Sequence, residues 1–246
     1  MIPLRDDNPL DRTPVVTILF VALNVLAFLW QLDLPALPAA LASGELLDFV
    51  RGRLSDTALR GGAIPYEILT LTDLYPRDLV PPPFTILTAM FLHGGVVHLA
   101  SNMLFLWIFG NNVEDALGRP RFVAFYLVCG IAAALVQVVA SAITGDIEVP
   151  MVGASGAIAG VLAAYMVLFP RARVTALVII VVFIRVIPVP AGFFIGLWFV
   201  LQVLSVLFGG SNGVALFAHI GGFVAGYVLV KVMGRYPGWR GRRVFW

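Results

Sequence analysis

The chain has 246 residues, of which 60% are hydrophobic and only 12% are charged, and its mean hydropathy is +0.97. This composition leaves too little polar surface to cover a soluble domain, so it predicts a polytopic membrane protein. The formal net charge of +2 comes with basic residues in short clusters at the ends of apolar segments, which gives no indication of a nucleic-acid-binding surface. Cys129 is the only cysteine, so an intrachain disulfide and a multi-cysteine metal site are excluded.

The first 14 residues are polar and proline-rich, and an apolar stretch at residues 15–32 follows them. That stretch is long enough to span a bilayer as a helix. A signal peptide is the alternative, because Arg5 and Arg12 precede the stretch and Ala40-Leu41-Ala42 resembles a cleavage site. The stretch exceeds the usual hydrophobic region of a signal peptide, so a retained helix is favoured.

Residues 35–83 form the one long polar stretch, and we expect them to lie outside the hydrocarbon, partly as an interfacial helix around residues 41–59. Residues 174–187 are rich in β-branched side chains and are followed by Pro188-Val-Pro190, which favours an interfacial or re-entrant connection over a span. The five further spans are expected at residues 84–109, 122–143, 155–169, 191–208 and 214–233.

Six spans place both termini on one side of the membrane. Twelve basic residues then lie on the side of the termini, against four in the 35–83 loop. The positive-inside rule therefore predicts cytoplasmic termini, with the 35–83 loop and residues 144–150 outside. We expect the protein in the plasma membrane of a bacterium.

Ser155 lies in the sequence Met-Val-Gly-Ala-Ser-Gly-Ala-Ile-Ala-Gly, at the start of the fourth expected span. Gly153 and Gly156 leave its hydroxyl sterically open, and a helix N-terminus there supplies free N–H groups suited to a developing oxyanion. Ordinary helix packing is the alternative, because Gly156 and Gly160 have the spacing of a small-xxx-small face.

His219 lies early in the sixth expected span, with no acidic residue between positions 214 and 233. Gly222 and Gly226 form a second close-packing face below it, so the fourth and sixth helices could approach until the imidazole meets the Ser155 hydroxyl. A serine activated by a histidine base is the chemistry that this pairing predicts. A histidine bonded only for structural reasons is the alternative.

His98 and Asn102 are four residues apart on the second expected span, so they share one face and offer two donors for an oxyanion. His93 precedes a Gly94-Gly95 break and is off that face, which favours a structural hydrogen-bonding role. The chain has no His-Glu-x-x-His pair, and every aspartate lies in a loop or near a helix end. Zinc and aspartyl proteases are therefore disfavoured, and we expect no metal and no cofactor.

These motifs resemble those of the rhomboid family of intramembrane serine proteases over roughly residues 84–226. The matching residues are His93, His98 and Asn102, then Gly110 to Gly118 with Tyr126, then Gly153-Ala-Ser155-Gly156, and finally Ala218-His219-x-x-Gly222-x-x-x-Gly226. The resemblance implies an all-α, six-transmembrane-helix bundle with a long external loop between helices 1 and 2. Together with hydropathy and charge, it leads us to expect a single rhomboid-like domain over residues 1–246, with a cytoplasmic tail (1–14), external loop 1 (35–83), a catalytic core (84–226) and a basic cytoplasmic tail (234–246).

The resemblance further implies a dyad of Ser155 and His219, with an oxyanion hole from His98, Asn102 and the Ser155 N–H. The partners it implies are the lipid bilayer and single-span membrane proteins, cut near the outer membrane face. Family members often carry an aromatic residue one turn after the serine, where this chain has Ala159; Phe217 or Phe223 are candidate replacements. They also often carry Trp-Arg where this chain has Phe84-Thr85.

Two other functional classes fit the same bundle. A non-catalytic relative would bind and escort transmembrane helices, and its mark would be loss of the dyad, which is intact here. A small-solute transporter would use the intramembrane histidines as an ion path, but no inverted repeat is apparent. The glycine-rich residues 209–213 precede His219, and we expect them to act either as a cap over the site or as a simple tight loop.

Overall fold

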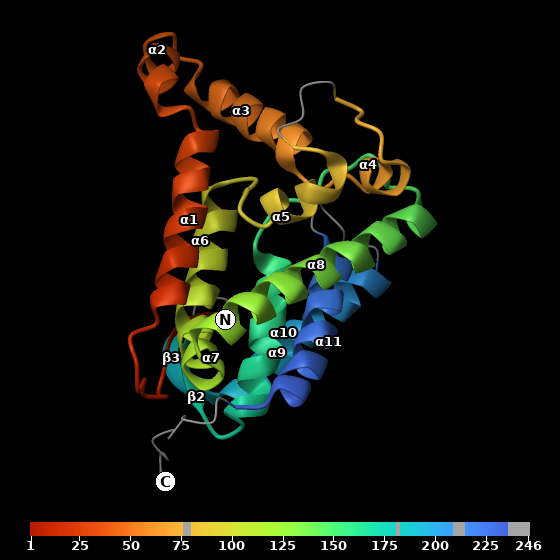
Figure 1. Ribbon diagram of the computed structural model, residues 1–246. Coiled ribbons are helices and arrows are strands. Elements are labelled where there is room, and N and C mark those ends of the chain that lie inside the picture. Colours follow the sequence, from red (N-terminus) through yellow and green to blue (C-terminus); the bar gives the residue numbers. More distant parts are fainter. Residues whose placement is uncertain (76–79, 181–182, 209–214, 236–246) are drawn as a thin grey trace.

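A computed structural model describes residues 1–75, 80–180, 183–208 and 215–235 of a chain that is mostly helical (Figure 1). Its elements in chain order are β1 (Ile2–Asp6), α1 (Val15–Gln31), the 3-10 turn η1 (Leu34–Ala36), α2 (Leu37–Ala42), α3 (Leu46–Gly61), α4 (Pro65–Thr70), the 3-10 turn η2 (Pro82–Phe84), α5 (Thr85–Ala89), α6 (Val96–Phe105), the π-helical turn η3 (Leu106–Gly110), α7 (Asn111–Leu117), α8 (Arg119–Thr144), α9 (Ser155–Leu168), β2 (Arg173–Ile180), β3 (Phe183–Pro190), α10 (Ala191–Leu207) and α11 (Leu216–Met233).

Apolar helices overlap all the stretches where the sequence predicted spans, but the second lies further along the chain than predicted, at Val96–Leu117 in place of residues 84–109. Within the described residues, three are long and apolar enough to cross a membrane: the continuous segment Val96–Leu117, α8 and α11. α1 and the segment Leu34–Ala42 meet at a bend of 42° and make a fourth candidate if they form one span. α9 and α10 are apolar but shorter, with 14 and 17 residues. Leucine, isoleucine and valine side chains are exposed along α1, α8, α10 and α11, as expected for surfaces that face lipid.

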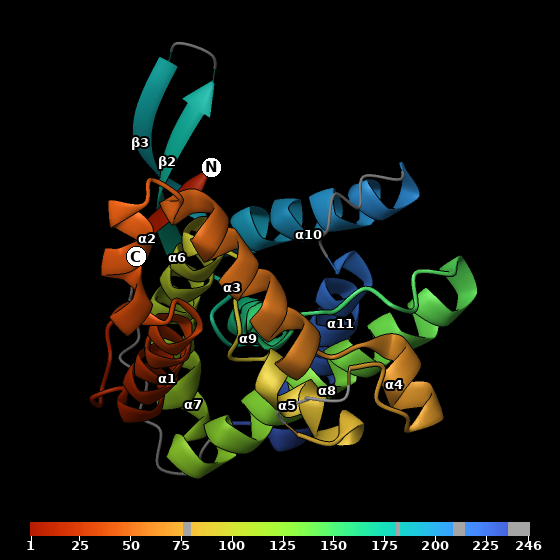
Figure 2. The same ribbon diagram turned by 90° about the horizontal axis from the view of Figure 1, so that it is seen from above.

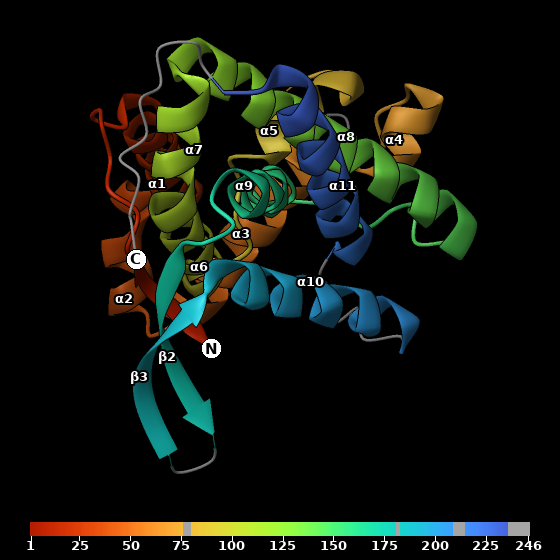
Figure 3. The same ribbon diagram turned by 90° about the horizontal axis from the view of Figure 1, so that it is seen from below.

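α9 is the central helix of the bundle, with α6, α8, α10 and α11 arranged around it (Figures 2 and 3). Eleven of its residues are buried. It lies closest to α11, where a Cβ added to Gly222 would collide with the Gly156 carbonyl, and one added to Gly226 would collide with the main chain of Gly160. The predicted close approach of these two glycine faces is confirmed, and it depends on the absence of side chains.

The all-α prediction is wrong in one respect, because the fold contains an antiparallel sheet of order β1-β2-β3. The stretch at residues 174–187 was predicted to be an interfacial or re-entrant connection, but its described residues, 174–180 and 183–187, lie in the paired strands β2 and β3, where Val174 pairs with Val189. β1 comes from the N-terminal segment, which we expected to be a simple tail, and its Asp6 pairs with Val174. Figure 2 shows the hairpin extending away from the helices. β-branched side chains favour strands, which explains the hairpin, but the pairing with β1 joins residues too distant for a local pattern to reveal.

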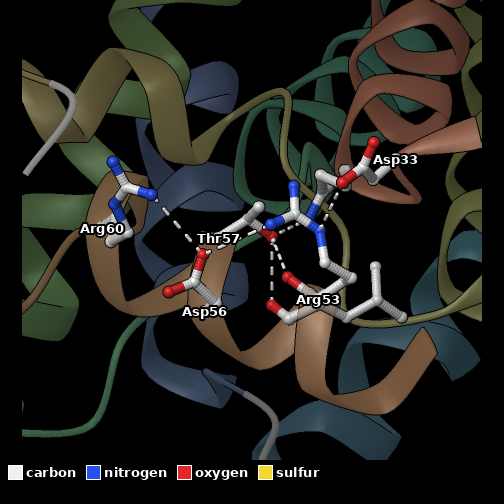
Figure 4. Close-up of polar contacts among 7 residues, drawn as sticks. Asp33, Arg53, Asp56, Thr57 and Arg60 are labelled. Atoms are coloured by element: carbon white, nitrogen blue, oxygen red, sulfur yellow. Dashed lines mark hydrogen bonds and ion pairs between the residues drawn. The ribbon is translucent and has the colours of Figure 1, made fainter. Parts of the chain in front are cut away.

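Residues 34–75 cover one end of the bundle, opposite the sheet (Figure 1). The helix predicted near residues 41–59 is present as α3. Arg53 of α3 lies 3.8 Å from Asp33, just after α1, and 3.8 Å from Asp56, which Arg60 also approaches at 3.6 Å (Figure 4). Such partly exposed ion pairs each contribute little, so they orient α3 more than they stabilise it.

The same segment also contacts the residues just before Ser155. Ala63 and Met151 exchange two main-chain hydrogen bonds of 3.0 and 2.9 Å, and the Tyr66 N–H donates to the Ile147 carbonyl. Because Ala63 and Ile64 are buried, this pairing holds residues 147–151 in place. The beginning of α9 is therefore fixed from outside the bundle.

Candidate active site

Ser155 is the first residue of α9, and the chain reaches it through a backbone conformation that favours glycine. Gly153 has φ +126°, and a Cβ there would also lie 2.8 Å from the His98 ring. The Gly153 N–H donates to the Ala89 carbonyl at 2.8 Å. The first N–H groups of a helix have no partner within the helix, so donors are concentrated around Ser155.

The structure brings Ser155 and His219 together. Ser155 Oγ and His219 Nε2 are 2.7 Å apart, a hydrogen-bonding distance, although the residues are 64 positions apart in the chain. His219 is only 8% exposed, so bulk water hardly competes for its ring. The other ring nitrogen, Nδ1, is 2.7 Å from Oε1 of Gln202 on α10.

His98 and Asn102 lie on one face of α6, beside Gly153, as their spacing predicted. A Cβ on Gly153 would be 2.8 Å from His98 Nε2 and 3.7 Å from Asn102 Nδ2. The Gly94 N–H approaches His98 Nδ1 at 3.4 Å, which makes Nδ1 the acceptor and leaves Nε2 as the N–H donor. Asn102 Nδ2 is buried, and no acceptor among the described residues bonds it. Both donors are thus free for a ligand near Gly153.

His93 lies outside this group but supports it. Its main chain bonds the Gln31 amide, and its ring is edge-on to the His98 ring with centroids 5.1 Å apart. His93 Nδ1 lies 3.3 Å from the Phe91 carbonyl. The main-chain bonds to Gln31 hold the segment that leads to α6, and the ring contact restrains the orientation of His98.

Ser155 and His219 face a cavity of about 740 Å³ that also contains His98 and Asn102. Polar side chains on its wall include Gln137, Ser141 and Asp146, so water can occupy it. Among the residues that the structure describes, no group of three or more His, Cys, Asp or Glu side chains could hold a metal ion.

Two side chains beside His219 were missed by the sequence analysis, and both lie on α10. The Trp198 ring is 5.7 Å from the His219 ring and tilted by 40°, so it provides an aromatic neighbour where Ala159 provides none. Phe223, one of the two candidates for this role, stacks instead on Phe199 at 4.2 Å. Gln202 could have been noticed as the one amide side chain in a span that is apolar apart from it and Ser205.

The cap predicted at residues 209–213 lies outside the described part of the chain. So does most of the basic tail predicted at residues 234–246.

Comparison with known proteins identifies the family. A sequence model of the Rhomboid domain matches residues 82–236, well over half of the chain. The chain belongs to the rhomboid family. It is 30% identical over 230 residues to the rhomboid protease GluP of Bacillus subtilis, a match that covers 90% of this chain and 35% of GluP.

Mitochondrial rhomboids are also similar. Rhomboid protein 1 of Saccharomyces cerevisiae is 35% identical over 124 residues, covering 48% of this chain and 32% of the yeast protein. The presenilin-associated rhomboid-like protein of Mus musculus is 40% identical over 87 residues, which cover 35% of this chain and 23% of the mouse protein. The matched regions thus span about a third or less of these relatives. The family resemblance read from the motifs is confirmed.

Proposed function

We propose that the protein is an intramembrane serine endopeptidase with Ser155 as nucleophile and His219 as general base. The observation that carries the proposal is the 2.7 Å contact between Ser155 Oγ and His219 Nε2, at the wall of a cavity that also holds two free donors. Family membership supports the same chemistry, since rhomboids are generally intramembrane serine proteases and GluP is named a protease.

The reaction follows from these positions. Ser155 Oγ attacks the carbonyl carbon of the scissile peptide bond while its proton passes to His219 Nε2. His98 Nε2–H, Asn102 Nδ2–H and the Ser155 N–H stabilise the oxyanion. His219 then gives its proton to the leaving amine nitrogen, and an ester on Ser155 remains. Water attacks this ester, its proton passes to Nε2, and transfer of that proton back to Oγ restores the enzyme.

The substrates in this proposal are single-span membrane proteins, cut near the outer membrane face. A peptide bond in a membrane helix is shielded from water, and the polar cavity supplies the water that hydrolysis requires. The proposed topology has six spans, namely α1, α6 with α7, α8, α9, α10 and α11, with residues 35–83 as the external loop. The positive-inside rule makes both termini cytoplasmic, and the membrane in this proposal is the plasma membrane of a bacterium.

The test is cleavage of a single-span substrate by the purified protein in proteoliposomes. Ser155→Ala and His219→Ala should each abolish cleavage, and a serine-reactive phosphonate should label the wild-type protein at Ser155. Ser205→Ala, which removes a hydroxyl bonded to the Leu201 carbonyl elsewhere on α10, is the control and should cleave normally. Cleavage that persists in both site variants would contradict the proposal.

A further inference from the structure

We infer that Gln202 is a positioning residue that holds His219 in the tautomer and orientation needed of a base, which rests on the function proposed above. Gln202 Oε1 lies 2.7 Å from His219 Nδ1, and Ser155 Oγ lies 2.7 Å from Nε2 on the other side of the ring. The imidazole is therefore bonded at both nitrogens, by residues of α9 and α10.

The contact selects one protonation pattern. An amide oxygen only accepts hydrogen bonds, so its partner Nδ1 carries the proton. In a neutral imidazole the lone pair is then on Nε2, where it accepts the Ser155 hydroxyl proton. The opposite tautomer would present an N–H to Ser155 and could not act as a base. In serine proteases with a third residue, a carboxylate performs this task, whereas the described residues around His219 offer a neutral amide.

The amide of Gln202 itself requires a hydrogen-bond partner. Its neighbours on α10 are apolar except Ser205, whose hydroxyl bonds the Leu201 carbonyl within the helix. An unpaired amide in a helix that faces lipid is costly, so Gln202 requires an acceptor or donor outside α10. His219 is the partner that the structure provides.

The position of Gln202 makes the contact depend on where α10 lies. The buried residues of α10 are Ala191, Phe194 and Ile195, all in its first turns. Gln202 lies two turns further on, in the part of the helix that has no buried residue. Trp198, one turn before it, is an aromatic neighbour of the His219 ring, with the ring centroids 5.7 Å apart. Two side chains of α10 therefore orient the imidazole, in a chain where α9 offers only Ala159.

The test measures the tautomer of His219 directly. Proteins labelled with ¹⁵N in the histidine rings are compared by NMR in detergent micelles, and His219 is assigned by comparison with His219→Ala. The Ser155→Ala background is used, because it removes the hydroxyl that otherwise also favours the Nδ1–H form. In this background His219 should be in the Nδ1–H form. Adding Gln202→Met, which keeps the length but loses the acceptor, should give a mixture, while Gln202→Glu should keep Nδ1–H.

Activity is measured separately with Ser155 intact. Gln202→Met should lower kcat about 100-fold, as for a misplaced catalytic group, with KM nearly unchanged, and Gln202→Glu should restore most of the rate. Ser205→Ala is the matched control on the same helix and should change neither the tautomer nor the rate. If Gln202→Met does not fold, Gln202→Leu replaces it in both measurements.

The outcomes separate the two proposals. An Nδ1–H form that is unchanged without Gln202 would overturn the positioning role, whatever the activity. If the tautomer of His219 depends on Gln202 but the wild-type protein cleaves no substrate, the positioning role is supported and the proposed protease function is contradicted.

Discussion

The side-chain amide of Gln31, at the end of α1, bonds both main-chain groups of His93. Its Oε1 accepts from the His93 N–H at 2.9 Å, and its Nε2 donates to the His93 carbonyl at 3.2 Å. Nε2 also donates to the Thr57 hydroxyl on α3. One glutamine therefore joins α1, α3 and the irregular chain that leads to His98.

Replacing Gln31 by leucine should destabilise the protein and lower its activity. Gln31 and His93 are fully buried, and each main-chain group left unpaired costs about 1–3 kcal/mol. Thermal unfolding in detergent measures the loss. Thr57→Val is the matched control, because it removes one bond to Gln31 and leaves both bonds to His93 intact. Equal destabilisation by the two changes would show that the pairing with His93 has no special weight.

Replacing Gly222 by alanine should separate α9 from α11 and disrupt the contact between Ser155 and His219. The added Cβ collides with the Gly156 main chain, which cannot move aside as a flexible side chain would. We expect about 1–3 kcal/mol of destabilisation from overpacking, and a fall in kcat of about 100-fold from the displaced base. Unfolding and cleavage assays measure the two effects.

Gly196→Ala is the control for this change, since a Cβ at Gly196 meets nothing within 4 Å. It should be neutral or slightly stabilising, because alanine favours a helix by up to about 1 kcal/mol over glycine. If Gly222→Ala behaves like Gly196→Ala, the two helices do not depend on this close approach.

The sequence predicted the elements that have a local signal and missed those that do not. Hydropathy located the apolar helices, and glycine spacing predicted that α9 and α11 approach closely at Ser155 and His219. The pairing of β1 with β2 joins distant segments, and no local pattern indicates it. α10 is apolar apart from Gln202 and Ser205, so its sequence has no periodicity to show which face meets the bundle. The sequence marks Gln202 as an unusual amide, but only the three-dimensional arrangement shows that it and Trp198 contact His219.

Asn102→Asp should lower kcat about 100- to 1,000-fold with little change in KM. The substitution keeps the shape of the side chain but replaces the free Nδ2 donor by an acceptor that repels an oxyanion. Cleavage kinetics in proteoliposomes measure the loss. His98→Ala should have an effect of similar size, since it removes the second donor. Normal kcat in either variant would exclude that residue from the oxyanion hole.

Asp6 of β1 should make stability depend on pH, because burial raises the pKa of its carboxyl from 3.8 to about 6, despite the opposing hydrogen bond from Tyr165. The Tyr165 hydroxyl donates to Asp6 at 2.6 Å, and Asn112 Nδ2 donates to it at 2.7 Å. Between about pH 4 and pH 6 the native protein keeps a proton on Asp6 that the unfolded chain has already released. Stability from this group is therefore fully present below pH 3.8 and falls as the pH rises to about 6.

Asp6→Asn removes this titration, so the melting temperature of the wild-type protein relative to Asp6→Asn should fall from pH 4 to pH 6 and then stay level. Thermal unfolding in detergent across this range measures the difference. Tyr165→Phe is the informative companion, because it removes a hydrogen bond that lowers the pKa of Asp6 while leaving the carboxyl buried, and it should move the upper end of the window to higher pH. A difference between wild type and Asp6→Asn that is constant from pH 4 to pH 7 would show that Asp6 titrates alike in the folded and unfolded chains, and that its burial does not keep it protonated.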